Sequence, residues 1–284
     1  MNQPADLSME DYQCDLIENV RNFIGRSFLC RKPNLRILDS GCDTTGRQLR
    51  KLAELTKGEV VGINPASGFP AASAIEAAGD RVRLHCMDGT KLEFPDASFD
   101  LVVSANVMEH VPDAVSYVKE CSRVLRPGGM AWIETAPCWT GPRGHHIHPD
   151  MIARHCPAET GYRNDGSVIP DWSHLRCSKD EMRAILNGRL RPETIDYILE
   201  YVYDSHDLNR TGWREIRAAI ETEFPWSQIA VWNVSNTDHS LAPCDGLDEY
   251  LVAGFQVAAT KRRPNPILHA VTRRLYWRMR RAGI

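Results

Sequence analysis

A histidine-rich stretch in the middle of the chain carries side chains suited to proton transfer near neutral pH. His145, His146 and His148 follow closely behind Trp139. Because the imidazole pKa lies nearest to neutrality, such a side chain can take a proton from a bound hydroxyl or amine. We predict that His145 or His146 serves as this general base. The alternative is that these histidines hydrogen-bond the backbone and hold their loop together.

Aromatic and charged residues around this stretch suit the binding of a small molecule. Trp139 and Trp172 can pack on such a molecule, and Arg210 can clamp an anionic group through two parallel hydrogen bonds. We predict these three residues, together with His148 and His174, as substrate contacts. For Arg210, a surface position just before a helix is an equally good interpretation.

The same stretch raises the question of a metal site. In an extended strand His146 and His148 lie on one face, and Asp150 or His174 would add a third ligand. The spacing matches no specific metal-binding pattern, and the nine cysteines are widely scattered with no Cys-x-x-Cys pair. We therefore predict no metal.

A second polar group follows the short apolar segments in the first half of the chain. Segments 35–38, 59–63, 81–87 and 100–105 are followed by Asp39-Ser40-Gly41-Cys42-Asp43, by Asn64, by Asp88-Gly89, and by Asn106 with Glu109-His110 one turn on. Ligands of open α/β sheets bind at the carboxyl ends of the strands. Polar groups at four successive strand ends suit a nucleoside, with partners for ribose hydroxyls, an adenine amine and a polar tail.

These polar residues need a sheet to hold them, and the chain alternates strand-like and helical segments. We expect strands at 35–38, 59–63, 81–87, 100–105, 130–135, 229–234 and 250–260, and helices at 8–24, 44–57, 71–78, 112–125, 179–186 and 213–223. This alternation predicts an α/β fold, a mostly parallel seven-stranded sheet with helices on both faces. Residues 138–210 lack strong periodicity and are expected to form a lid inserted after the fifth strand.

Five stretches in chain order carry a family resemblance. They are Ile37-Leu38-Asp39-Ser40-Gly41-Cys42, Val60-Val61-Gly62-Ile63, the segment 88–100, Asn106-Val107-Met108-Glu109-His110-Val111 and Leu125-Arg126-Pro127-Gly128-Gly129. Together they resemble the class I S-adenosylmethionine-dependent methyltransferases of the group called type 11. The resemblance implies a Rossmann-like fold, residues 1–260 as one methyltransferase domain, and S-adenosyl-L-methionine as cofactor.

At the first two strand ends the resemblance implies contacts with one part of the cofactor. Asp39 and Gly41, with Cys42 beside them, would line its methionine part. Asn64 stands where the family usually has an acidic residue for the ribose hydroxyls, and a neutral amide forms a weaker hydrogen bond there. Asp43 also replaces a glycine of the family's first loop. We expect the cofactor still to bind, and a use other than methyl transfer, such as cyclisation, stays the alternative.

At the next two strand ends the resemblance implies the adenine side of the site. Asp88 would accept a hydrogen bond from the adenine amine, with Gly89 beside it. Asn106 would contact the cofactor through its backbone, and His110 would brace that turn. A nicotinamide dehydrogenase is disfavoured, because the Gly-x-Gly-x-x-Gly pattern is absent.

The resemblance and the lid together predict methyl transfer to an oxygen or nitrogen of a small-molecule or sugar-like acceptor. A lipid-linked or polymer-bound acceptor is a further alternative. Orientation of the two reacting atoms supplies much of the catalysis in such a displacement, and a general base adds to it.

Composition and charge restrict the class of protein. The chain has 284 residues, 43% of them hydrophobic and 25% charged, and no run approaches the ~20 apolar residues of a membrane span. Residues 1–15 contain four acidic side chains and no basic one, unlike a secretory signal. We expect a cytoplasmic protein with reduced thiols.

The net charge of −3 hides an uneven distribution. Eight of the 34 basic residues lie in 261–284, so 26 basic residues face 37 acidic ones in the rest, a net charge of −11. An acidic body disfavours nucleic acid as a partner. From Pro266 onward the tail has the pattern of a basic amphipathic helix, which predicts either peripheral membrane contact or self-association.

Overall fold

The computed structural model describes residues 9–43, 45–65, 80–159, 168–233, 242–243 and 247–261. The helix expected at 71–78 and the basic tail helix from Pro266 onward lie outside these residues. No helix of the described ranges is long and apolar enough to cross a membrane. The cysteines whose side chains the structure describes are free thiols, namely Cys30, Cys42, Cys86, Cys121, Cys138, Cys156 and Cys177.

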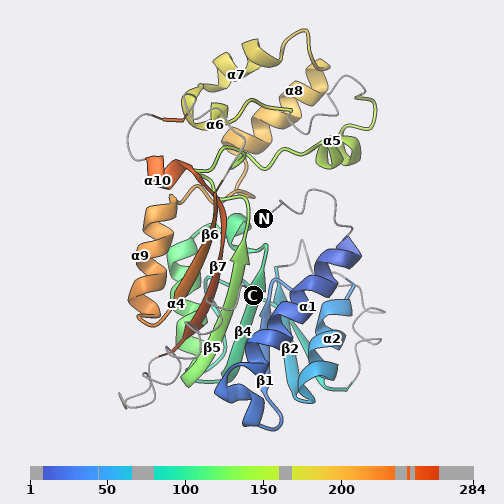
Figure 1. Ribbon diagram of the computed structural model, residues 1–284. Helices are drawn as coiled ribbons and strands as arrows, with labels where there is room; N and C mark the ends of the chain where they lie inside the picture. Colours follow the sequence, from blue (N-terminus) through green and yellow to red (C-terminus); the bar gives the residue numbers. More distant parts are fainter. Residues whose placement is uncertain are drawn as a thin grey trace.

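A seven-stranded sheet forms the centre of the molecule (Figure 1). Its strands are β1 (Arg36–Ser40), β2 (Glu59–Asn64), β3 (Val82–Cys86), β4 (Phe99–Ala105), β5 (Leu125–Thr135), β6 (Gln228–Asn233) and β7 (Val252–Thr260), in the order β3-β2-β1-β4-β5-β7-β6. Of the seven strands, β7 alone runs opposite to the other six. The predicted mostly parallel α/β sheet is thereby confirmed.

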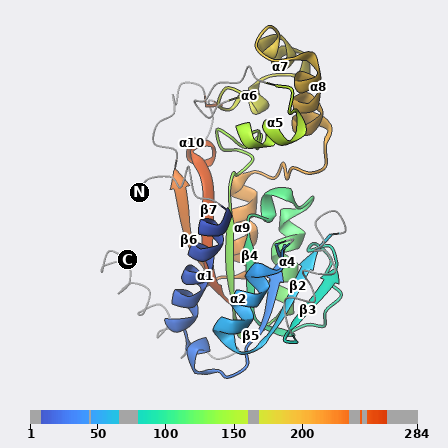
Figure 2. The same ribbon diagram turned by 90° about the vertical axis from the view of Figure 1, so that its right-hand side faces the viewer.

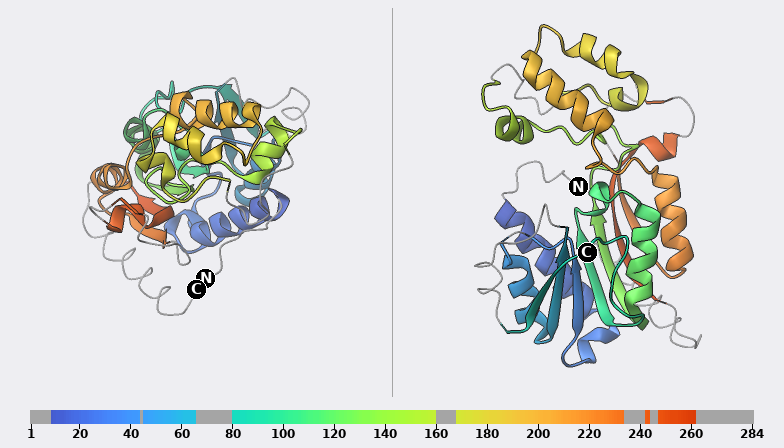
Figure 3. Two further views of the ribbon diagram at one scale, coloured as in Figure 1. Left: turned by 90° about the horizontal axis from the view of Figure 1, so that it is seen from above. Right: turned by 180° about the vertical axis from the view of Figure 1, so that it is seen from behind.

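Helices cover both faces of the sheet, as Figure 3 shows from behind. One face carries α1 (Met9–Gly25), the short helix η1 (Phe28–Arg31) and α2 (Arg47–Thr56), and the other carries α4 (Ala114–Val124) and α9 (Trp213–Glu223). Side chains alternate across a strand. Accordingly Leu101 and Val103 of β4 pack in the first layer, whereas Val102 packs in the second.

One strand boundary differs from the expectation. β5 begins at Leu125 rather than at residue 130, because Leu125 already pairs with Phe99 of β4. An irregularity in the register then separates this pair from the pair of Leu101 with Met130. The Arg-Pro-Gly-Gly segment that reads as a turn therefore lies inside an interrupted strand.

The segment after β5 forms a helical lid above the carboxyl ends of the strands (Figure 2). It contains α5 (Pro149–His155), α6 (Ser173–Arg176), α7 (Lys179–Leu186), α8 (Pro192–Leu199) and the π-helical turn η4 (Glu200–Asp204). The lid has its own apolar cluster, which includes Ile152, Met182, Leu186, Ile195 and Ile198. Only α7 was expected; α5 and α8 each begin with a proline at the first helical position, a signal that the sequence does carry.

Two short helices complete the upper edge of the sheet. The turn η3 (Met108–His110) follows β4, and α10 (Leu247–Tyr250) precedes β7. Both contact the lid, because His110 of η3 hydrogen-bonds the Asp207 carbonyl and the Tyr250 carbonyl of α10 accepts from Trp172 Nε1.

Candidate functional site

The strand order reverses between β1 and β4, so their carboxyl ends form the switch point of the sheet. β1 is flanked by β2 on one side and β4 on the other. The polar residues after these three strands therefore lie along one edge, which is where open α/β sheets bind ligands. The predicted cofactor residues are brought together there.

Asp39 is a fully buried acid at the end of β1. The Gln48 amide nitrogen donates to both of its carboxyl oxygens, at 2.9 and 3.1 Å. Burial, the larger cause, and the negative charge of Asp43 together raise the pKa of Asp39 to about 8, although the Gln48 hydrogen bond opposes them. The site thus holds an acid that ionises readily only when a positive charge comes near it.

The loop after β1 turns sharply at Gly41, whose φ of +82° favours glycine. A Cβ atom at this position would lie 2.1 Å from Val107 Cγ2, so the loop and the residue before η3 are in close contact. Cys42 beside it is buried, and burial raises the pKa of its thiol well above the usual range. Cys42 is accordingly a packing residue with a protonated thiol.

Asn64 closes this loop from the end of β2. Its Nδ2 donates to the Cys42 carbonyl oxygen at 2.8 Å. A carboxylate has no proton to donate in this position. The departure from the family's acidic residue therefore has a structural reason, because the amide holds the first loop against β2.

Asp43 is the residue that caps α2. Its carboxylate accepts from the backbone N–H groups of Arg47 at 3.3 Å and Gln48 at 3.1 Å, and it also accepts from the Thr45 backbone and hydroxyl. The Arg47 and Gln48 donors belong to the first turn of α2, where an anion is favoured. The apparent insertion in the loop thus supplies the helix with an acidic cap, and α2 begins at Arg47 rather than at residue 44.

We expect the Asp43→Ala variant to lower the free energy of unfolding by about 1–2 kcal/mol, because the first N–H groups of α2 lose their acceptor. Asp43→Asn keeps an acceptor oxygen and serves as the matched control, with a smaller loss. Urea denaturation followed by circular dichroism measures both. Equal stability of the alanine variant and the wild type would contradict the capping role.

Asp88 and Gly89 follow β3 at the other side of the edge. Asp88 is exposed, and its Oδ1 accepts from the Thr90 N–H and hydroxyl, both at 2.8 Å. A Cβ on Gly89 would come within 2.6 Å of the Tyr117 ring. The Tyr117 hydroxyl oxygen lies 2.8 Å from Ser40 Oγ and 2.7 Å from Ser104 Oγ, so it donates one hydrogen bond to one serine hydroxyl and accepts one from the other. A buried hydroxyl network therefore supports the floor of the predicted cofactor site.

Asn106 and η3 form the turn after β4. Asn106 is exposed and has a φ of +52°, and its N–H donates to the Glu134 carbonyl at 2.9 Å. His110 is exposed, and its Nδ1 lies 2.9 Å from the Asp207 carbonyl oxygen. Because a carbonyl can only accept, Nδ1 carries the proton. His110 thus braces the turn against the end of the lid.

Glu109 was not predicted as a functional residue, and it is the most unusual side chain at this edge. It is 7% exposed, and its Oε2 accepts from the Thr135 hydroxyl, whereas Oε1 has no hydrogen-bond partner among the described residues. Burial raises the pKa of Glu109 to about 8. The sequence does show an acidic residue directly before His110 of the family motif. Its position in a short turn, however, does not reveal that the side chain is buried.

His146 reaches the same turn from the lid. One ligating atom each of Glu109, His110 and His146 lie within 4.8 Å of one another. The rings of His110 and His146 have centroids 4.8 Å apart, and those of His146 and His148 have centroids 5.3 Å apart. His146 has a φ of +58°, and burial lowers its pKa to about 3, so its imidazole is neutral. One of the two predicted bases therefore lies at the edge of the sheet.

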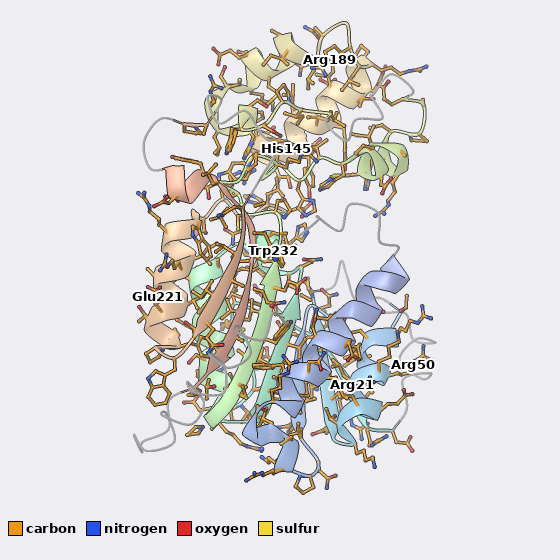
Figure 4. All side chains as sticks on the ribbon, in the orientation of Figure 1. Arg21, Arg50, His145, Arg189, Glu221 and Trp232 are labelled. Atoms are coloured by element: carbon orange, nitrogen blue, oxygen red, sulfur yellow. The ribbon has the colours of Figure 1, made fainter. Side chains whose placement is uncertain are left out.

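His145 lies in the lower part of the lid, where Figure 4 labels it, and its ring meets the His174 ring edge-on at 5.4 Å between centroids. It is 2% exposed, and its Nδ1 accepts from the Ile147 N–H at 3.0 Å. Burial also holds the pKa of His145 well below its ordinary value. These contacts match the loop-holding alternative for this residue.

Three of the predicted substrate residues lie together at the base of the lid. His174 Nε2 donates to the Trp139 carbonyl at 2.8 Å, and its ring meets the Trp139 ring edge-on at 4.7 Å between centroids. The Arg210 guanidinium lies 5.4 Å from the Trp139 ring centroid and donates to the Val202 carbonyl. Trp172 is fully buried, and its Nε1 donates to backbone carbonyls, so its ring packs inside the protein.

Known proteins resemble the sheet region of the chain. Residues 38–133 match a family model described as a methyltransferase domain. An uncharacterized methyltransferase of Mycobacterium sp. (strain JLS) is 43% identical over 89 residues, which make up 31% of this chain and 34% of that protein. The chain therefore matches about a third of the length of this relative.

A longer match and a solved structure extend the comparison. A protein of Oryza sativa subsp. japonica named "Probable tocopherol O-methyltransferase, chloroplastic" is 30% identical over 238 residues, 75% of this chain and 62% of that protein. The crystal structure of the YcgJ protein of Bacillus subtilis is 13% identical and superposes with a TM-score of 0.48, covering 88% of this chain and 99% of that one.

Proposed function

Since the chain belongs through residues 38–133 to the class I S-adenosylmethionine-dependent methyltransferases, we propose that it transfers a methyl group to an oxygen or nitrogen of a small-molecule or sugar-like acceptor. The observation that carries the proposal is the common edge of the sheet. There the loop at Gly41 adjoins the turn that carries Glu109 and His110, and His146 reaches this turn from the lid.

The residues of this edge fit S-adenosylmethionine, the cofactor of the family. The cofactor carries a positive sulfonium and an amino group, and two carboxyl groups lie at this edge, Asp39 at the end of β1 and Asp43 in the loop after it. The exposed Asp88 can accept from the adenine amine. Asn106 offers its backbone at the end of β4, which adjoins β1. The negative charge of the acidic groups near β1 thus complements the positive charge on the methionine part of the cofactor.

The bound cofactor would supply a methyl group on a positively charged sulfur, which would keep the electron pair of the broken carbon–sulfur bond when the acceptor takes the methyl group. The protein's own task is to align the acceptor with that methyl group and to accept or direct its proton. Glu109 and His146 lie at the edge where such an acceptor would arrive, and the lid restricts access of water.

On this proposal the two predicted bases have different roles: His146 contacts the acceptor, whereas His145 stabilises its loop. We expect His146→Asn to lower kcat at least about 100-fold with unchanged cofactor affinity, because a polar partner of the acceptor is lost. Asparagine tolerates the left-handed backbone of His146. We expect His145→Ala instead to lower the free energy of unfolding by about 1–3 kcal/mol, because the Ile147 N–H loses its acceptor.

The test is incubation of the full chain with methyl-labelled cofactor and cell extract, followed by mass spectrometry of the labelled product. A labelled small molecule with stoichiometric S-adenosylhomocysteine supports the proposal. Release of methylthioadenosine, or consumption of a substrate without label, would favour a non-methyl reaction. Once the acceptor is known, the His145 and His146 variants are compared in the same assay. Loss of turnover with His145→Ala but not with His146→Asn would reverse the assignment.

A further inference from the structure

We propose that Glu109, His110 and His146 bind a divalent transition-metal ion, which holds an acceptor through two neighbouring oxygen atoms. The three residues offer one carboxylate oxygen and two imidazole nitrogens within 4.8 Å of one another. Ligand atoms of one such ion lie about 3–4 Å apart, because each is about 2 Å from the ion. Small side-chain rotations therefore suffice to bring the observed arrangement into coordination.

The tautomer of His110 is the one that a metal ligand requires. Its Nδ1 lies 2.9 Å from the Asp207 carbonyl oxygen, so this nitrogen carries the proton. The lone pair consequently resides on Nε2. Metal-binding histidines almost always donate their other ring N–H to a carbonyl or carboxylate in this way, which fixes the ring orientation. The end of the lid thus supplies the outer support that a metal site needs.

Glu109 provides the second independent observation. Its Oε2 is engaged by the Thr135 hydroxyl, and its buried Oε1 has no hydrogen-bond partner among the described residues. A buried carboxyl oxygen without a partner is costly. A cation bound between Glu109 and the two histidines would remove that cost and would stabilise the ionised form.

His146 completes the set from a separate segment. It belongs to the loop that enters the lid, and its N–H donates to the Arg143 carbonyl at 3.0 Å. Its ring is half-buried against the exposed ring of His110. Because the ligands come from both the sheet edge and the lid, a bound ion would also tie the lid to the sheet.

The ligand types indicate which ion is bound and what it would do. Two imidazoles with one carboxylate suit zinc, iron or manganese better than magnesium or calcium. Three protein ligands leave open positions for substrate oxygens. On the proposed methyl-transfer function, an acceptor with adjacent hydroxyl or carbonyl oxygens would occupy them. The ion lowers the pKa of the coordinated hydroxyl, whose O–H bond breaks with the proton passing to water and the electron pair staying on oxygen.

Isothermal titration calorimetry with zinc chloride tests the site on the full chain after removal of metal by a chelator. We expect one zinc ion per chain, with affinity reduced at least about tenfold in both Glu109→Gln and His146→Asn. Glutamine keeps an acceptor for the Thr135 hydroxyl, and asparagine suits the backbone of His146. His155→Asn is the control, because His155 is an exposed lid histidine that stacks on Tyr197 away from the cluster.

The outcomes separate the metal site from the proposed function. Absence of one-to-one zinc binding, or binding that both variants leave unchanged, overturns the metal site. If Glu109→Gln does not fold by circular dichroism, His146→Asn decides alone. Methyl transfer that persists in chelator at full rate also overturns it while leaving the proposed function intact. Zinc binding that only the two cluster variants weaken supports the site, even where no methylated product has been found.

Discussion

Replacing Asp39 with asparagine is expected to abolish the release of about one proton that accompanies binding of S-adenosylmethionine at pH 7. Burial and the charge of Asp43 raise the pKa of Asp39 to about 8, so the carboxyl group of the free protein is mostly protonated at pH 7. A cationic ligand beside it favours the ionised form and expels the proton. The asparagine variant has no such proton and retains an oxygen to accept from Gln48.

The sign of the pH dependence follows from this raised pKa. Between pH 6 and pH 8 the fraction of ionised Asp39 increases, so the affinity of the wild type should rise up to about tenfold per pH unit. The affinity of Asp39→Asn should stay flat over this range and be at least about tenfold weaker at pH 8. Calorimetry in two buffers of different ionisation enthalpy gives both affinity and proton release. A wild type that binds the cofactor without releasing a proton would contradict the prediction.

The raised pKa of Asp39 should also make the free energy of unfolding depend on pH. This free energy should fall as the pH rises, whereas the affinity for the cofactor rises. In the unfolded chain Asp39 ionises near the ordinary aspartate pKa of 3.8, whereas in the folded protein it holds its proton up to about pH 8. The folded state therefore binds more protons in this window, and stability falls as pH rises. We expect Asp39→Asn to be more stable than the wild type at pH 9 by a larger margin than at pH 5. Urea denaturation at both pH values provides the check.

Gly41→Ala is expected to lower the free energy of unfolding by about 2–5 kcal/mol and to disturb the site on both of its sides. The left-handed backbone of Gly41 costs any residue with a Cβ about 1–2 kcal/mol. The new methyl group would also lie 2.1 and 2.9 Å from the two Val107 methyl groups, and such overpacking adds about 1–3 kcal/mol. Because Val107 leads into η3, the displacement reaches Glu109 and His110.

Gly188→Ala is the matched control for this prediction. Gly188 also has a positive φ, +74°, but a Cβ at that position meets nothing within 4 Å. Gly188→Ala should therefore lower the free energy of unfolding by only about 1–2 kcal/mol, the cost of placing a residue with a Cβ in a left-handed backbone conformation. The double variant Gly41→Ala/Val107→Ala should recover part of the loss by removing the clashing methyl groups. Equal losses at Gly41 and Gly188 would show that the contact with Val107 is unimportant.

The sheet was largely predictable from the sequence because its strands are short apolar runs with both faces buried. Leu101, Val102 and Val103 show this pattern, and their alternation between the two helical layers follows from strand geometry. The start of β5 was missed because a Pro-Gly-Gly segment normally ends regular structure, whereas here a single pair with Phe99 precedes an irregularity. Local sequence cannot show such a distant partner.

Individual residues of the site could be predicted from the sequence only where they directly follow or end a strand, because the strand then fixes their position. Asp39, Asn64 and Asn106 follow β1, β2 and β4, so the topology alone brings them to one edge. The neighbours His145 and His146 could not be separated by sequence, because a positive φ at His146 turns the two rings to different surroundings. The burial of Glu109 likewise depends on Thr135 and on the lid, both distant in the sequence.

The two ends of the lid meet at one point of the sheet. Trp139 at its start lies against Arg210 at its end, and Asn209 donates to the backbone carbonyls of Met108 and Glu109 at 2.9 and 2.7 Å. An insertion whose ends adjoin can be exchanged for another of different length without altering the strands beneath. On the proposed function, grafting the lid of a related methyltransferase between these positions should change which acceptor is methylated while the cofactor site stays the same.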